Sequence, residues 1–119
     1  MITGGQIVLF RFPHTDQKSS NLRPALVIQK LPGRYDDWLI SMISSQLNQE
    51  IPGFDEIIST DEPDFKNSGL KLPSLIRIGR LAIINADILL GTIGHIDHGR
   101  LKRIRQKLSK WILSTYNSV

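Results

Sequence analysis

Residues 23–28 of the chain read Arg-Pro-Ala-Leu-Val-Ile, and this segment is the starting point for predicting the fold. Its last four residues are all apolar, and the β-branched pair Val27-Ile28 favours extended backbone. We therefore expect a strand that is buried on both faces. Pro24 can begin such a strand because the first residue need not donate a hydrogen bond to a neighbouring strand. The polar, turn-rich residues 13–22 that precede it predict an exposed loop.

Further strands are expected on both sides of this segment. Gln6 to Phe12 alternates its apolar residues between two faces. Trp38 to Ile43 is another strand-forming run, and it ends in the hydroxyl pair Ser44-Ser45. The later sequence predicts a short edge strand at 55–59, a loop with one helical turn at 61–71, one bent strand or two strands at 75–84 with a bulge or kink at Gly79, and a last short strand at 91–96.

The C-terminal part predicts a basic amphipathic helix at about residues 97–115. Asp97 suits the N-cap position, and apolar residues then recur at offsets of three and four. With 119 residues the chain has room for a single domain, 1–119. Several short strands and one terminal helix predict a mainly β domain, a small bent sheet or barrel packed on the helix. The apolar stripe consists of Leu101, Ile104, Leu108, Trp111 and Ile112. We interpret Trp38 and Trp111 as core anchors.

Charge is distributed unevenly along the chain, whose formal net charge is +4. From Asp97 to the end, six basic residues accompany one acid, a local charge of +5, so the other 96 residues sum to about −1. Between Glu50 and Asp64, six acids occur with no Lys or Arg. The basic helix face could attract a polyanion, or its cations could simply face solvent. The charge pattern alone leaves both interpretations open.

Several classes of site are excluded or disfavoured. The chain has no cysteine, which excludes disulfides, cysteine-based zinc sites and thiol nucleophiles. No apolar run reaches about 18 residues, and the N-terminus lacks a secretory pattern, so we expect a cytoplasmic protein with no membrane partner. Phosphate-loop, dinucleotide-binding and nucleophile-elbow motifs are absent. His95-x-x-His98 has no evident third ligand, so we expect no metal and no cofactor.

Three motifs follow one another in the first half of the chain. A turn, Phe12-Pro13-His14-Thr15-Asp16, is followed by Arg23-Pro24-Ala25-Leu26-Val27 and then by Ile43-Ser44-Ser45-Gln46. In this order they resemble the PemK/MazF family of toxin endoribonucleases. The resemblance runs from about Gly4 to Trp111, because later segments also follow the family's order. These are Gly69-Leu70, Ser74-Leu75-Ile76, Ile84-Asn85 and Ile93-Gly94-His95-Ile96.

The resemblance implies a fold, a reaction and partners. The fold would be a small SH3-like barrel with a C-terminal helix, as in PemK, MazF and CcdB toxins. The activity would be metal-independent cleavage of single-stranded RNA at short sequences, as the toxin of a type II toxin-antitoxin system. The partners would be the RNA, a cognate antitoxin protein and a second copy of the chain in a homodimer.

The resemblance also assigns roles to individual residues. Arg23 matches the catalytic Arg before Pro, and Ser44 matches a Thr that many members place at the end of the third strand. Ser45 and Gln46 follow it as RNA-binding or supporting residues, and Arg77 lies where some members place a second active-site Arg. Two residues after Arg77, some members carry an acid, a candidate base, where this chain has Gly79.

Physical chemistry supports these roles. The substrate's own 2′-hydroxyl can serve as the nucleophile, giving a 2′,3′-cyclic phosphate and a 5′-hydroxyl. A planar guanidinium can meet two phosphate oxygens at once, and a Ser hydroxyl can donate to the same oxyanion. Because the pKa of Arg exceeds about 12, Arg23 is assigned mainly electrostatic stabilisation. His14 could supply a group that titrates near neutral pH, or it could contact RNA or nothing.

Two other functions remain open at this point. A CcdB-like poison of DNA gyrase would share the barrel and use the end of the C-terminal helix, near Trp111. A non-catalytic SH3-like module would bind RNA or protein, and the missing acid at Gly79 favours that interpretation. The combination of Arg23-Pro24 with Ser44-Ser45-Gln46 favours the ribonuclease over the gyrase poison, and the binding module stays open.

Overall fold

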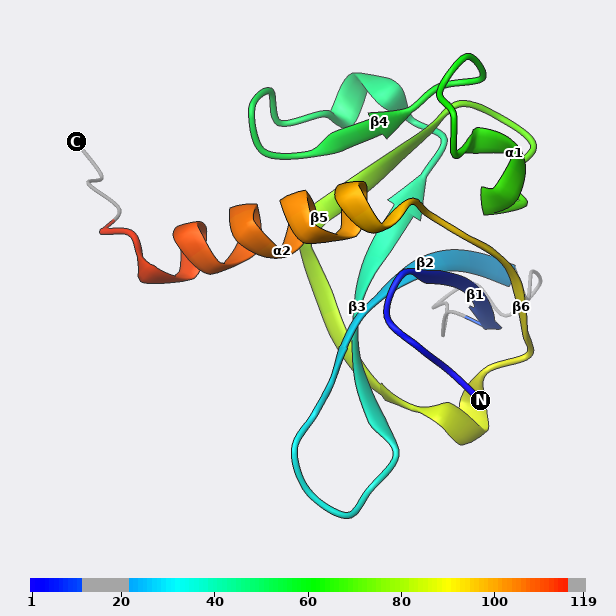
Figure 1. Cartoon of the computed structure of the whole chain (residues 1–119), viewed down its shortest axis with the longest axis vertical. Helices are drawn as coiled ribbons and strands as arrows, with labels where there is room; N and C mark the ends of the chain where they lie inside the picture. The colour runs from blue at the N-terminus through cyan, green and yellow to red at the C-terminus, as the bar shows by residue number, and fades with distance from the viewer. Residues whose placement is uncertain (12–21, 116–119) are drawn as a thin grey trace.

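One curled antiparallel sheet dominates the structure, a computed structural model that describes residues 1–11 and 22–115. In this part of the chain six strands pair in the order β4-β5-β3-β2-β1-β6, and helix α2 lies against the sheet (Figure 1). The predicted mainly β architecture with a C-terminal helix is confirmed. The strands are β1 (Gln6–Arg11), β2 (Leu22–Lys30), β3 (Asp37–Ser44), β4 (Glu56–Ile58), β5 (Ser74–Asn85) and β6 (Gly91–His95). The helices are η1 (Leu47–Gln49), α1 (Phe65–Ser68), η2 (Ala86–Ile88) and α2 (His98–Leu113), of which η1 and η2 are 3₁₀-helices.

Strand β2 is the central strand that its sequence predicts. Residues 25–28 are at most 2% exposed, so both of its faces are buried as expected. The strand begins at Leu22, however, so Pro24 is its third residue and not its first. Proline is tolerated there because β2 pairs with β3 only from Ala25 onward. The missing N–H of Pro24 therefore lies just outside the β2–β3 ladder.

The two faces of the sheet are covered by two separate cores. Ile7, Leu26 and Ile28 belong to the core between the sheet and α2. Val8 and Trp38 belong to the core on the opposite face. From α2 the first core receives Leu101, Ile104 and Leu108, and the second core also contains Phe10, Ala25, Val27, Ile40 and Ile84. The alternation in the strand sequences thus divides their side chains between two cores.

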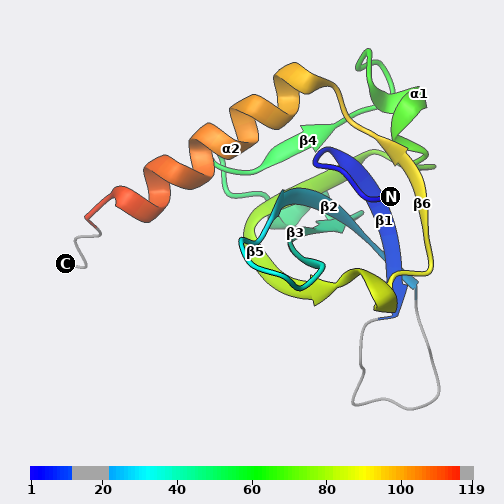
Figure 2. The same cartoon turned by 60° about the horizontal axis from the view of Figure 1, so that its bottom comes forward.

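The two tryptophans have different environments. Trp38 is a core anchor as predicted: it is 8% exposed, and its indole N–H donates to the Asp36 carboxylate at 2.7 Å. The same prediction is wrong for Trp111, which is 48% exposed and packs edge-to-face with the Phe54 ring, with centroids 5.6 Å apart. Ile112 is also exposed, because the last turns of α2 extend past the sheet (Figure 2). The apolar stripe is longer than the surface that covers it.

Strand β5 contains the bulge expected near Gly79. Its register against β3 shifts between Ser41↔Leu81 and Met42↔Arg77, which leaves residues 78–80 unpaired with β3. Two buried side chains bond the backbone of Ile78: Ser41 donates to its carbonyl at 3.1 Å, and its N–H donates to Asp55 at 3.1 Å. The bulge explains why Arg80 breaks the alternation of this strand. A Cβ at Gly79 would lie 3.1 Å from the Phe54 ring, so a side chain there would require the ring to move by a few tenths of an ångström.

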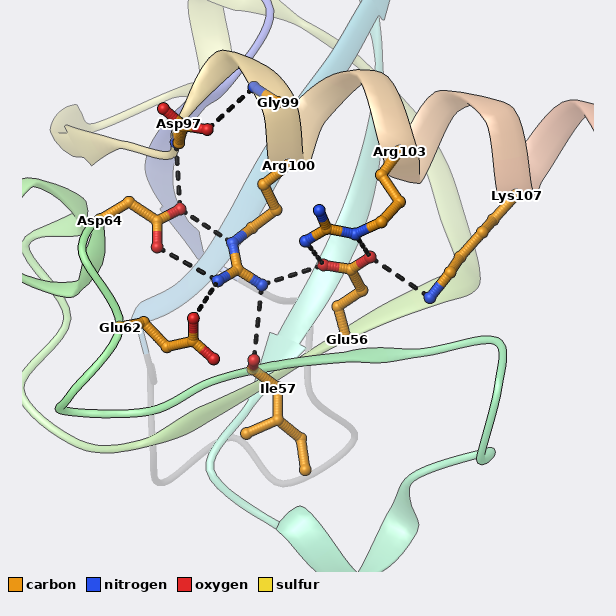
Figure 3. A network of polar contacts seen from close by, with 9 residues as sticks. All are labelled: Glu56, Ile57, Glu62, Asp64, Asp97, Gly99, Arg100, Arg103 and Lys107. Atoms are coloured by element: carbon orange, nitrogen blue, oxygen red, sulfur yellow. Dashed lines mark hydrogen bonds and ion pairs between the residues drawn. The ribbon is translucent and has the colours of Figure 1, made fainter.

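Helix α2 begins where the sequence predicts, and an ion network ties it to the acidic segment. The carboxylate of Asp97 caps the helix by accepting from the N–H of Gly99 at 2.9 Å. Behind it, Arg100 is only 6% exposed and pairs with Asp64 at 2.8 Å, Glu56 at 2.9 Å and Glu62 at 3.2 Å (Figure 3).

The other cations on this side of α2 complete the network. Glu56 also pairs with Arg103 at 2.6 Å and with Lys107 at 3.2 Å. Arg105 donates instead to the Ile28 carbonyl, at 2.6 and 3.0 Å. Four of the six basic residues of this segment therefore bond to the chain itself. Three of these, Arg100, Arg103 and Lys107, are paired with carboxylates, so half of the six cations are compensated within the fold.

Acid is expected to weaken this network. Burial alone would raise the pKa of Glu56 and Asp64, but their hydrogen bonds and ion pairs with Arg103, Lys107 and Arg100 lower both pKa values below their ordinary values of 4.5 and 3.8. A carboxylate whose pKa is lowered by folding stabilises the protein above its unfolded-state pKa and loses that contribution as the pH falls through the folded value. We expect the free energy of unfolding in urea to hold above pH 4.5 and to fall progressively below it. A stability that stayed constant down to pH 3 would contradict this.

Candidate functional site

Two adjoining cavities open where β2, β3 and β5 end or begin. The first has a volume of about 410 Å³ and the second about 320 Å³, at the lower end of the usual range for ligand sites. Both are lined by Arg23, Ile43, Ser44 and Gln46. The first adds Leu22, Pro24, Ser45, Lys71, Leu72 and Ser74, and the second adds Met42, Gln49 and Arg77.

Strand register places three of the predicted residues on one face of the sheet. Met42 of β3 lies opposite both Ala25 of β2 and Arg77 of β5, and opposite residues of an antiparallel pair point to the same face. Arg23 lies two residues before Ala25 and Ser44 two residues after Met42, so both share that face. Arg23, Ser44 and Arg77 thus converge from three adjacent strands. The face is the one turned away from α2.

The cavities exist because the strand ladder stops. The last β2–β3 pair toward this end is Ala25↔Met42, and the lining residues 23–24 and 43–46 lie beyond it. Pro24 cannot donate a further ladder hydrogen bond toward β3. The strand ends are therefore free to separate, and the space between them is closed on another side by the loop that carries Lys71 and Leu72.

The Ser44 hydroxyl is oriented by the turn that follows it. Its oxygen accepts a hydrogen bond from the N–H of Gln46 at 3.0 Å. A hydroxyl that accepts in this way keeps its own O–H available to donate. Ser44 therefore presents a donor at the wall shared by the two cavities.

The site is positively charged. Arg23, Lys71 and Arg77 line it, and none of the three has an ion-pair partner among the described residues. No Asp or Glu of residues 1–11 and 22–115 lines either cavity. The Nε atom of Arg77 is buried without a hydrogen-bond partner in that same part of the chain. Such an arrangement suits a ligand with several anionic or acceptor oxygens.

The structure brings together most of the residues selected from the sequence. Arg23, Ser44, Ser45 and Gln46 all line the first cavity, and Arg77 joins Arg23 at the second. His14 lies outside the described residues. Sequence reasoning missed other lining residues, among them Met42, Gln49, Lys71 and Leu72. Gln49 offered one signal, since it lies three residues after Gln46, whereas Lys71 sits in a distant loop and offered none.

Two further features bear on cofactors and membranes. His95 and His98 lie together at smaller cavities beside the start of α2. Across the described residues, no group of three or more His, Cys, Asp or Glu side chains could hold a metal ion. In the same part of the chain, no helix combines the length and apolarity needed to cross a membrane.

Comparison with known proteins places the chain in a family. The model of the PemK-like, MazF-like toxins of type II toxin-antitoxin systems matches residues 3–112. Among solved structures, the Mycobacterium tuberculosis toxin MazF-mt6 is similar with a TM-score of 0.63 at 13% identity, over 93% of this chain and 99% of that one.

A second solved structure is described as an endoribonuclease in complex with its cognate antitoxin from mycobacterial species. It is similar with a TM-score of 0.65 at 10% identity, over 98% of this chain and all of that one. These likenesses confirm the predicted fold class. Comparison with curated protein sequences gives no match. The match over residues 3–112 shows that the chain belongs to the PemK-like, MazF-like toxin family of type II toxin-antitoxin systems.

Proposed function

We propose that the chain is the toxin endoribonuclease of a type II toxin-antitoxin system, cutting single-stranded RNA at short sequences without a metal ion. The observation that carries the proposal is the pair of cavities at the strand ends. Arg23, Lys71 and Arg77 line them with no acid and no ion-pair partner among the described residues, beside a Ser44 hydroxyl free to donate. Of the six cations of α2, by contrast, three are paired with carboxylates. Family membership supports the same reading.

The reaction would use the substrate's 2′-hydroxyl. The 2′-oxygen attacks phosphorus, the bond from phosphorus to the 5′-oxygen breaks, and the products are a 2′,3′-cyclic phosphate and a 5′-hydroxyl. The 2′-hydroxyl loses its proton to a base, and the departing 5′-oxygen takes one up. Arg23 stabilises the charge that develops on the phosphorane oxygens, and Ser44 donates to one of them. Purified protein incubated with mixed RNA in EDTA should release these ends, and intact RNA would refute the proposal.

Ser44→Ala tests the hydroxyl. The variant should cleave RNA about 10²-fold more slowly, because one donor to the oxyanion is lost. Ser44→Thr keeps the hydroxyl and should retain most of the rate. Ser109→Ala, at an exposed position on α2, is the matched control and should leave cleavage unchanged. A Ser44→Ala variant as fast as the native chain would remove Ser44 from the mechanism.

We also infer the partners from the family. One similar structure is described as bound to its cognate antitoxin, and we propose that this chain has an antitoxin of its own. A short reading frame beside its gene is the place to look for it. We further propose a cytoplasmic homodimer, and sedimentation that showed only a 13.5 kDa species at micromolar concentration would contradict the dimer.

One observation favours a second candidate, the CcdB-like gyrase poison. The end of α2 exposes Trp111, Ile112 and Leu113, and CcdB-like toxins use this part of the helix. A gyrase poison would leave purified RNA intact and would trap cleaved DNA with the topoisomerase. The two activities are therefore distinguished by incubating the same preparation with each target.

A further inference from the structure

Two amide side chains line the second cavity, one on each side of a single helical turn. Helix η1 (Leu47–Gln49) follows the site strand directly, with Gln46 as its N-cap and Gln49 as its last residue. The N–H of Gln49 donates to the Gln46 carbonyl at 3.1 Å. Gln46 and Gln49 both line the second cavity.

These amides are free to bind a ligand. Neither side chain has a hydrogen-bond partner among the described residues, and both residues are exposed. Each amide offers two donors and one acceptor oxygen. Met42 and Ile43 supply an apolar wall to the same cavity, and Arg77 supplies a guanidinium. An apolar wall with a few convergent polar groups suits a flat, neutral ring that carries donors and acceptors on its edge.

We propose that the second cavity binds a nucleobase of the RNA and that Gln46 and Gln49 read its edge, with Gln49 determining specificity. This rests on the proposed ribonuclease function. The base belongs to a nucleotide next to the cleaved bond, because both cavities share Arg23 and Ser44. Single-stranded RNA is generally recognised through bases that are splayed out and hydrogen-bonded on their edges, as this cavity allows. The neutral amides and the apolar wall are the part of the cavity that suits a base, whereas Arg23 and Arg77 suit the adjoining phosphate.

Mapping the ends of a fully random RNA pool after partial digestion tests the inference. The native chain should show a base preference at one position fixed relative to the cut. Gln49→Leu removes the amide at similar size and should reduce that preference by roughly 5- to 150-fold, the usual worth of a bidentate base contact. Gln49→Glu replaces a donor with an acceptor and should favour a different base at that position. The measured quantity is the ratio of cleavage between sequences in the same pool, so a change that slows all cleavage equally does not affect it.

The control and a binding measurement make the outcomes separable. Gln106→Leu makes the same change on the exposed face of α2 and should keep the native preference. A preference unchanged in both Gln49 variants would overturn the inference while leaving the ribonuclease intact. The same variants are also used to select from a 2′-deoxy pool, which the proposed reaction cannot cut. Suppose that the native chain cuts no RNA. If it still selects particular sequences from the 2′-deoxy pool, and the selection depends on Gln49, the base-binding site is supported without the ribonuclease. If it selects none, both the base-binding site and the ribonuclease are refuted.

Discussion

RNA cleavage by an Arg23→Ala variant is expected to be slower than that of the native chain by about 10³-fold. Arg23 lines both cavities, lies on the same sheet face as Ser44 and has no ion-pair partner among the described residues. Its loss would leave the developing phosphorane charge without its main cation. Because the side chain is exposed, removing it should leave the thermal unfolding of the protein unchanged. Cleavage is measured in EDTA on a defined single-stranded RNA.

Two companion variants separate the guanidinium from general charge. Arg23→Lys keeps the charge but not the planar fork of donors, so it should restore only part of the rate. Arg34→Ala removes an exposed guanidinium from the turn between β2 and β3, where it stacks on the Tyr35 ring, and should cleave normally. If Arg23→Ala cut RNA at the native rate, the proposed site would be wrong. If the native chain cut nothing, a binding module or a gyrase poison would be the better description.

Replacing Arg100 with methionine is expected to lower the free energy of unfolding by about 3–5 kcal/mol, the usual cost of removing one partner from a buried ion pair. Asp64 would lose its guanidinium and keep only the N–H of Asp97, at 3.0 Å, from the rest of the network (Figure 3). Glu56 would still pair with Arg103 and Lys107. The loss is a large share of the stability of a typical domain, about 5–15 kcal/mol. Urea unfolding at pH 7 measures it.

The network offers its own controls. Lys102→Met removes an exposed cation of α2 that has no ion-pair partner among the described residues, and it should change stability by less than about 0.5 kcal/mol. A second variant, Arg100→Met with Asp64→Asn, removes the buried charge that the first leaves unpaired and should recover part of the loss. Equal stability of Arg100→Met and the native chain would mean that the network contributes nothing net.

Agreement between sequence and structure is best where local pattern decides. The double-faced burial of residues 25–28, the edge strand β4, the bulge at Gly79 and the Asp97 cap all follow from a few adjacent residues. Trp111 shows where such reasoning fails. It fits the helical stripe as well as Leu108 does, but the stripe cannot reveal that the sheet ends before it.

The residues of the site likewise fall into those that the sequence indicated and those that it did not. Arg23, Ser44 and Arg77 could be selected because their motifs resemble those of a family, and register then places them on one face. Lys71 and Leu72 reach the first cavity from a loop between α1 and β5, and neither residue belongs to the segments that carry the family resemblance. Gly79 stands where some members of the family carry an acid, and the Phe54 ring packs closely against it.

By itself the sequence determined where most strands and the final helix form, because backbone preference and apolar periodicity act over a few neighbouring residues. Which cations lack an ion-pair partner depends instead on the tertiary structure. Arg100 and Arg103 meet carboxylates more than thirty residues away, whereas Arg23 and Arg77 meet none among the described residues. The physical reason is that charge compensation and strand separation depend on contacts between distant segments, which no local pattern encodes.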